Sequence, residues 1–341
     1  MHREHRLGRL GHDPIEWMFG GVVSVGCLTV YLTLRPPLFD YDGYMYRKWA
    51  MAAEPWYNAN PHHLLWNVCQ MAVAKLAYSL GHPTTVPFQV AGILESCAVL
   101  FLFFLWLRRT LDSRSFAVAA AALLAFTPAF WLVTLQNHPY PLALLFLLLY
   151  FLCRHSPEDE LPTTRRLIAA ALFLAASALF HQAVALLIVP AAIVVTVYGK
   201  QDLTPRMLRS LLWSGAVFLL ILGSYVWFWQ TIDPDDSLLR WSSSYAAELH
   251  PPEILEMGVL PLFARAIAGF SGSLVQTDAL KTTLADNLEK SQVFTLYTIF
   301  GLARLAGTVW WLARPGTRHH MWSLIRNSPL FALSALSVLS W

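Results

Sequence analysis

The chain has 341 residues, of which 56% are hydrophobic and only 13% are charged, whereas soluble domains have about 25% charged residues. Its mean hydropathy of +0.48 describes the whole chain, and a single globular core cannot hide that many apolar residues, so the sequence predicts an integral membrane protein. The composition excludes collagens, disordered tails and disulfide scaffolds. With a net charge of +3 and no basic run with interleaved aromatic residues, we expect no nucleic-acid partner.

Nine apolar runs are long enough to cross a bilayer at about 1.5 Å per residue. The first, 17–34, follows a basic head without a cleavage site, which indicates an uncleaved signal anchor. The others lie at 88–107, 115–134, 139–153, 166–181, 182–199, 210–230, 291–313 and 322–341. Pro128, Pro141 and Pro190 predict kinks in their helices. The predicted fold class is an all-α polytopic membrane protein, with residues 1–341 as one transmembrane domain that either ends at the outer interface or continues in a longer protein.

Residues 62–80 decide the predicted topology. They include Asn67, Gln70 and Lys75, together with an apolar stripe at helical spacing that consists of Leu64, Leu65, Val68, Ala72 and Leu76. This pattern is typical of an amphipathic juxtamembrane helix that lies along the outer interface without crossing it. With this segment flat, the basic residues between spans gather on the inner side, as the positive-inside rule requires. We therefore expect a cytoplasmic N-terminus and two large outer loops, 35–87 and 231–290.

The first outer loop contains two carboxylates, Asp40 and Asp42, followed by Arg47 and Lys48. Carboxylates two residues apart could share a divalent cation such as Mg²⁺ or Mn²⁺, or one could act as a base while the other orients it. The alternative is an ordinary solvated turn at Asp42-Gly43. No cofactor follows from the residues with certainty.

The same loop contains His62 and His63 directly after Asn60-Pro61. Asn60 and Pro61 suit the cap and first position of a helix. A helix N-terminus flanked by two imidazoles attracts anions, phosphate in particular. The alternative is that Asn-Pro only caps the helix while the histidines lie in headgroup water.

Three further polar residues fall near the outer ends of predicted spans. Glu95 lies roughly 10 Å below the outer end of its span, and is either functional or a protonated group bonded to a neighbouring helix. His138 and His181 lie in outer turns, at the depth of the other candidates. No nucleotide, metalloprotease or hydrolase motif is present. No internal repeat is evident, which weakens an inverted-repeat transporter.

The order of these features resembles the C-type (GT-C) membrane glycosyltransferases, particularly bacterial protein O-mannosyltransferases and lipid A aminoarabinose transferases. The resemblance covers about residues 15–200. It rests on an acidic and aromatic motif in the first outer loop, a His/Pro-rich start of the juxtamembrane helix, a paired-arginine inner turn, a Thr-Pro and a Pro-Tyr. Here these are Asp42 to Tyr46, Pro61-His62-His63, Arg108-Arg109, Thr127-Pro128 and Pro139-Tyr140.

The resemblance implies an inverting glycosyltransferase of the hexosyltransferase type in a bacterial cytoplasmic membrane. Such an enzyme moves a sugar from a polyprenyl-phosphate donor to a hydroxyl of a lipid, glycan or protein acceptor at the outer face. Asp42 would act as the general base, with Asp40 supporting it or holding a metal. His62, His63, Arg47 or Lys48 would stabilise the charge on the departing phosphate.

Two other functions remain open at this point. The chain could be a transporter or flippase of a lipid-linked substrate, with Glu95, His138 and His181 along a polar path. It could also be a non-catalytic, GT-C-like assembly partner. A transporter needs polar groups near the midplane and towards both faces, whereas the polar residues here concentrate at the outer end, which favours the enzyme.

Overall fold

The computed structural model describes residues 14–35, 41–52, 61–81, 85–110, 113–154, 164–188, 191–192, 203–238 and 241–242. The chain divides into two compact units, Met1–His250 and Pro251–Trp341, and the described residues all belong to the first. Every regular element in them is helical, which confirms the all-α class for this part of the chain. The predicted spans 291–313 and 322–341 and most of the outer loop 231–290 lie outside the described residues, and a single domain over 1–341 stays a prediction.

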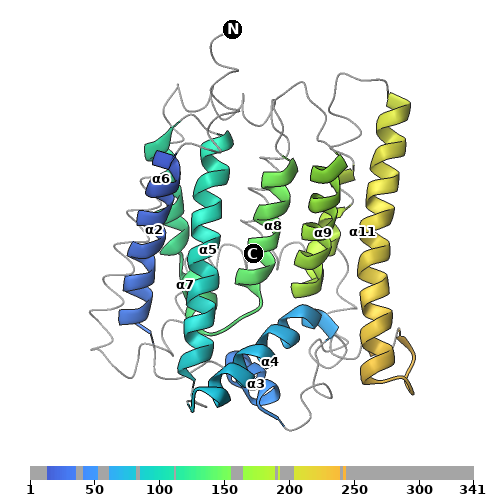
Figure 1. Ribbon diagram of the computed structural model, residues 1–341, viewed down its shortest axis with the longest axis horizontal. Coiled ribbons are helices and arrows are strands. Elements are labelled where there is room, and N and C mark those ends of the chain that lie inside the picture. Colours follow the sequence, from blue (N-terminus) through green and yellow to red (C-terminus); the bar gives the residue numbers. More distant parts are fainter. Residues whose placement is uncertain are drawn as a thin grey trace, which may run out of the picture. The chain divides into compact units, whose positions relative to one another are not determined.

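Three described helices are long and apolar enough to cross a membrane. They are α2 (Pro14–Thr33), α5 (Val86–Thr110) and α11 (Leu203–Ile232) (Figure 1). In α11 the stretch that is apolar enough to cross is Met207–Ile232. The bent pair α6 (Arg114–Ala125) and α7 (Pro128–Leu135) makes a fourth if the two are one span. Shorter helices are α8 (Tyr140–Arg154) and α9 (Thr164–Phe180). The predicted span 182–199 begins as the 3₁₀ helix η4 (Gln182–Leu187), and most of its remainder lies outside the described residues.

The bend between α6 and α7 occurs at Thr127-Pro128 and measures 63°. Proline lacks an N–H and disfavours helical backbone in the residue before it, so the helix stops here and restarts. The Thr127 hydroxyl accepts the Phe130 N–H at 3.2 Å, which caps α7. The Tyr31 hydroxyl of α2 donates to the Ala125 carbonyl oxygen at 2.7 Å, which satisfies a carbonyl at the end of α6. The kink predicted at Pro128 is confirmed. Pro141 instead lies in the first turn of α8, where proline is tolerated, and Pro190 lies outside the described residues.

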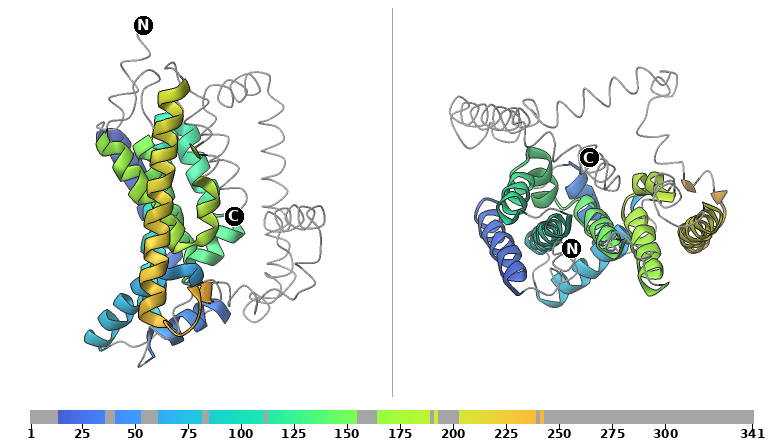
Figure 2. Two further views of the ribbon diagram at one scale, coloured as in Figure 1. Left: turned by 90° about the vertical axis from the view of Figure 1, so that its right-hand side faces the viewer. Right: turned by 90° about the horizontal axis from the view of Figure 1, so that it is seen from above.

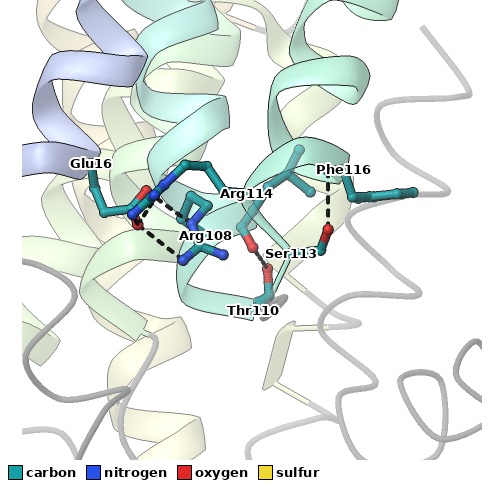
Figure 3. Close-up of polar contacts among 7 residues, drawn as sticks. Glu16, Arg108, Thr110, Ser113, Arg114 and Phe116 are labelled. Carbon is teal, nitrogen blue, oxygen red and sulfur yellow. Dashed lines mark hydrogen bonds and ion pairs between the residues drawn. The ribbon is translucent and has the colours of Figure 1, made fainter.

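One end of the helices, here called the arginine end, is held by a buried ion cluster (Figure 3). Glu16, in the first turn of α2, is only 1% exposed. It accepts Arg108 Nε and Nη2 at 2.9 and 3.0 Å, and Arg114 Nη2 at 2.7 Å. Arg108 lies in the last turn of α5 and Arg114 begins α6. The cluster therefore joins three helices and shows that α2 and α5 run in opposite directions.

The opposite end, here called the histidine end, carries α3 (Tyr41–Ala50), η3 (Pro61–His63) and α4 (Leu64–Ser79). Helix α2 ends there and α5 begins there, so the segment between them returns to the end that it left. In Figure 1, α3 and α4 lie across the lower ends of the longer helices. This course agrees with a segment 62–80 that does not cross, because a crossing would place the start of α5 at the arginine end; its position at a membrane interface stays a prediction.

The buried side of α4 carries polar as well as apolar residues. Its buried residues include Trp66, Gln70, Ala74 and Ala77, at helical spacing. The expected apolar stripe is divided: Leu64 is buried with Leu65 and Val68 packed around it, whereas Ala72 and Leu76 are exposed, Leu76 by 58%. Lipid is as apolar as a protein core, so an apolar stripe on an interfacial helix does not tell which side packs on protein. The packed side includes a glutamine.

Candidate functional site

Four histidines and two tyrosines from distant segments meet at the histidine end. The ring centroids are 5.0 Å apart for His63 and His181, and 4.8 Å apart for His181 and Tyr140. The Tyr46 ring lies 5.9 Å from His63 and 6.3 Å from His138, edge to face with both. We call this group the histidine cluster; its members are His62, His63, His138, His181, Tyr46 and Tyr140.

Helix ends bring these residues together. His62 and His63 form most of η3, which leads into α4. His181 directly follows the end of α9 and precedes η4. His138 follows Asn137, whose left-handed backbone (φ 60°) turns the chain from α7 towards α8. The predicted grouping of the four histidines at one depth is thereby seen in three dimensions.

Hydrogen bonds define the proton positions of two imidazoles. His63 Nδ1 lies 3.1 Å from the Phe180 carbonyl oxygen. A carbonyl only accepts, so Nδ1 carries the hydrogen, and in the neutral ring Nε2 is an acceptor. The Gln182 amide Nε2 contacts His62 Nδ1. With the Gln182 amide in this orientation its nitrogen donates, and the hydrogen of neutral His62 is then on Nε2.

Two imidazoles of the cluster, those of His63 and His181, are held neutral. Burial, with the neighbouring His181, lowers the pKa of His63 well below its usual value, although the bond to Phe180 acts in the other direction. Burial, with a smaller contribution from His62, lowers the pKa of His181 to about 4. At pH 7 both rings are uncharged. These two histidines can therefore act on a ligand through hydrogen bonds, not through positive charge.

Helix α3 connects the cluster to the predicted acidic residues. Tyr46 is buried, and besides the histidines it contacts Trp66 of α4 at 6.4 Å between ring centroids. Asp42 lies one helical turn before Tyr46 in the first turn of α3. The side chain of Asp42 and all of Asp40 lie outside the described part of the chain. Arg47 and Lys48 follow Tyr46 in the last turn, Arg47 half-buried and Lys48 exposed.

A metal site at Asp40 and Asp42 therefore stays a prediction. Within the described ranges no group of three or more His, Cys, Asp or Glu side chains is arranged to hold a metal ion.

Glu95 lies in the half of α5 that is nearer the histidine end. Burial, together with the Glu95 charge, raises the pKa of Cys69 on α4 to about 11, which places the carboxyl near that helix. Two further buried side chains meet close by, since Asn137 Nδ2 donates to Gln70 Oε1 at 2.8 Å. We did not predict Tyr46, Tyr140, Gln70 or Asn137 as site residues. Two sequence features could have indicated some of them: a glutamine within an otherwise apolar helix, and an Asn-His pair between two predicted spans.

Comparison with known proteins gives one match. Residues 89–204 match the family model of the TMEM260 N-terminal domain, described as a protein O-mannosyl-transferase. The matched range runs from α5 to the start of α11 and includes Glu95, His138 and His181, but not α3 or η3. No curated protein and no solved structure matches the chain. The match supports a glycosyltransferase-like family, in agreement with the class of enzyme expected from the resemblance.

Proposed function

We propose that the protein is an inverting membrane glycosyltransferase that moves a sugar from a polyprenyl-phosphate donor to an acceptor hydroxyl at the outer face of the membrane. The observation that carries this proposal is the histidine cluster, gathered at one end of the helices beside the helix that contains Asp42. The match to a protein O-mannosyl-transferase family model over residues 89–204 supports it. The other end carries Arg108, Arg109 and Arg114, which favours a cytoplasmic arginine end and an outward histidine end.

In the proposed reaction Asp42 accepts the proton of the acceptor hydroxyl. The hydroxyl oxygen attacks the anomeric carbon of the sugar from the side opposite the phosphate. The bond from this carbon to the phosphate oxygen breaks, and polyprenyl phosphate leaves with the bonding electrons. Asp40 supports the base, or holds a divalent cation that would neutralise charge on the phosphate. The polyprenyl tail stays in the bilayer, beside the interfacial helix α4.

The proton positions assign different tasks to His62 and His63. The Nε2–H of His62 is an N–H donor suited to a phosphate oxygen. His63 Nε2 carries a lone pair and is suited to accept a hydroxyl hydrogen. Arg47 and Lys48 would provide the positive charge that neutral imidazoles lack.

The test is transfer of label by the purified full chain in lipid nanodiscs. The protein is incubated with radiolabelled polyprenyl-phosphate sugars, mannose among them, and with a membrane extract as the source of acceptor. We expect label from at least one donor to enter a lipid, glycan or protein product. Asp42→Asn removes the base, and Asp235→Asn is the matched control, an exposed carboxylate just after α11. Absence of transfer by the wild-type protein from every donor would refute the proposed function.

A further inference from the structure

A buried amide pair lies between α4 and the turn after α7. Asn137 Nδ2 donates to Gln70 Oε1 at 2.8 Å, and the two residues are 0% and 2% exposed. Asn137 has a φ of 60°, a left-handed conformation that asparagine tolerates better than most residues. This conformation is part of what brings the amide under α4.

The close approach of α5 to this turn is favoured by a glycine at residue 92. A Cβ atom at Gly92 would lie 3.0 Å from the Thr134 carbonyl oxygen and 3.7 Å from Asn137 Cα. One turn further along α5, the Ser96 hydroxyl accepts the Thr134 hydroxyl at 2.9 Å. The turn that carries Asn137 is therefore pressed against the same part of α5 that carries Glu95.

Several buried polar atoms of these elements have no hydrogen-bond partner among the described residues. Besides Trp66 Nε1 of α4, they are Gln70 Nε2, Asn137 Oδ1 and Glu95 Oε2. Exchanging the oxygen and nitrogen of both amides would still leave one donor and one acceptor, so the result does not depend on how the amides are oriented. Buried polar groups without partners are costly, and native proteins rarely keep them without a ligand, a water or a role. We call Gln70, Asn137 and Glu95 the amide-carboxyl cluster.

The chemistry of the cluster selects the kind of ligand. It offers an amide donor, an amide acceptor and a carboxyl group, and none of its members is a cation. A phosphate would find no positive charge among these groups, whereas a sugar hydroxyl both donates and accepts and so matches them. We propose that Gln70, Asn137 and Glu95 form the subsite that binds the hydroxyl groups of the transferred sugar. This inference rests on the proposed glycosyltransferase function and adds the residues that distinguish one sugar from another.

Helix α4 controls how a sugar reaches the amide-carboxyl cluster. Gln70 belongs to α4, which covers the cluster from the histidine end. Because Gln70 and Asn137 are buried and so is Glu95 Oε2, a sugar reaches these atoms when α4 moves away from α5. Helix α4 does not cross the membrane and its far side is exposed, with Leu76 58% exposed. Such a movement leaves the spanning helices packed.

The experiment compares donors that differ only in the sugar. Transfer by the purified full chain is measured with the preferred polyprenyl-phosphate sugar and with its epimers on the same lipid. In Gln70→Met and Glu95→Gln we expect the ratio of kcat/KM between preferred donor and epimer to fall by about 10-fold, since a site that pairs with a hydroxyl rejects analogues that lack or misplace it. Ser96→Ala is the matched control, a buried polar residue next to Glu95 whose ratio should change less than about 2-fold.

Binding provides a second measurement that does not depend on turnover. The wild-type protein should bind the sugar-bearing lipid about 10-fold more tightly than bare polyprenyl phosphate, and Gln70→Met should lose most of this difference. If Gln70→Met does not fold, Gln70→Glu, which keeps length and polarity, takes its place. Equal losses for all donors, with unchanged ratios, would overturn the inference and indicate a structural role or a buried water. Absence of wild-type transfer from any donor would instead refute the proposed function, and the inference with it.

Discussion

Removal of the Glu16 carboxylate should destabilise the arginine end more than any other single change there. The side chains of Glu16 and Arg108 are 1% and 8% exposed, and two hydrogen bonds join them at 2.9 and 3.0 Å. Glu16→Ala would leave the Arg108 guanidinium buried without its counter-charge. Breaking a buried ion pair in this way costs about 3–5 kcal/mol. We expect the lower end, about 3 kcal/mol, because the Arg114 side chain is 39% exposed and water reaches that side.

A double-mutant cycle separates the two arginines. The free energy of unfolding is measured in one detergent for the wild type and for single alanine variants of Glu16, Arg108 and Arg114. It is also measured for the two double variants that combine the Glu16 change with one arginine change. The coupling between Glu16 and Arg108 should be about 2–3 kcal/mol, whereas the coupling to the partly exposed Arg114 should stay below about 1 kcal/mol. Thr29→Ala is the matched control in α2, since its hydroxyl is exposed and bonds only its own helix, to the Val25 carbonyl oxygen.

Two outcomes would refute this reasoning. If Glu16→Ala costs no more than Thr29→Ala, the ion cluster does not hold the three helices together. If Arg114 couples to Glu16 as strongly as Arg108 does, burial is not what sets the strength of the pair.

Three other measurements test the site and the topology. Asp42→Asn should reduce sugar transfer by about 10² to 10⁴-fold with donor binding nearly unchanged, because the amide cannot take a proton. If this variant transfers sugar at the wild-type rate, Asp42 is not the base and has no catalytic role. The melting temperature should fall as the pH is lowered from about 6.5 towards 4, because the unfolded chain then protonates His181 while the folded chain, with a pKa of about 4, does not. His181→Gln should flatten this slope, and an equal slope in the variant would contradict the assignment. Asp112→Cys, in a background without other cysteines, should react with an impermeant reagent only from the cytoplasmic side; labelling from outside would reverse the topology.

Local features of the chain were readable from the sequence because each depends on neighbouring residues. The length of an apolar run predicts a span, and α2, α5 and α11 lie in three of the predicted runs. Pro128 predicts a break, because a missing N–H disrupts a helix wherever it occurs. The polar residues of 62–80 and the distribution of arginines together predicted a helix that does not cross. The four histidines were also expected at one depth, since helix direction alone places them there.

Only the tertiary structure decided which side chains meet. Asn137 and Gln70 are 67 residues apart and Glu16 and Arg108 are 92 apart, and no local pattern pairs them. In a soluble protein the apolar face of a helix indicates its packed side. Among lipid-exposed helices that indication is lost, because lipid and protein interior are equally apolar. This is why the packed side of α4, with Gln70 on it, and the contact of Tyr46 with His63 and His138 became visible only once the helices were assembled.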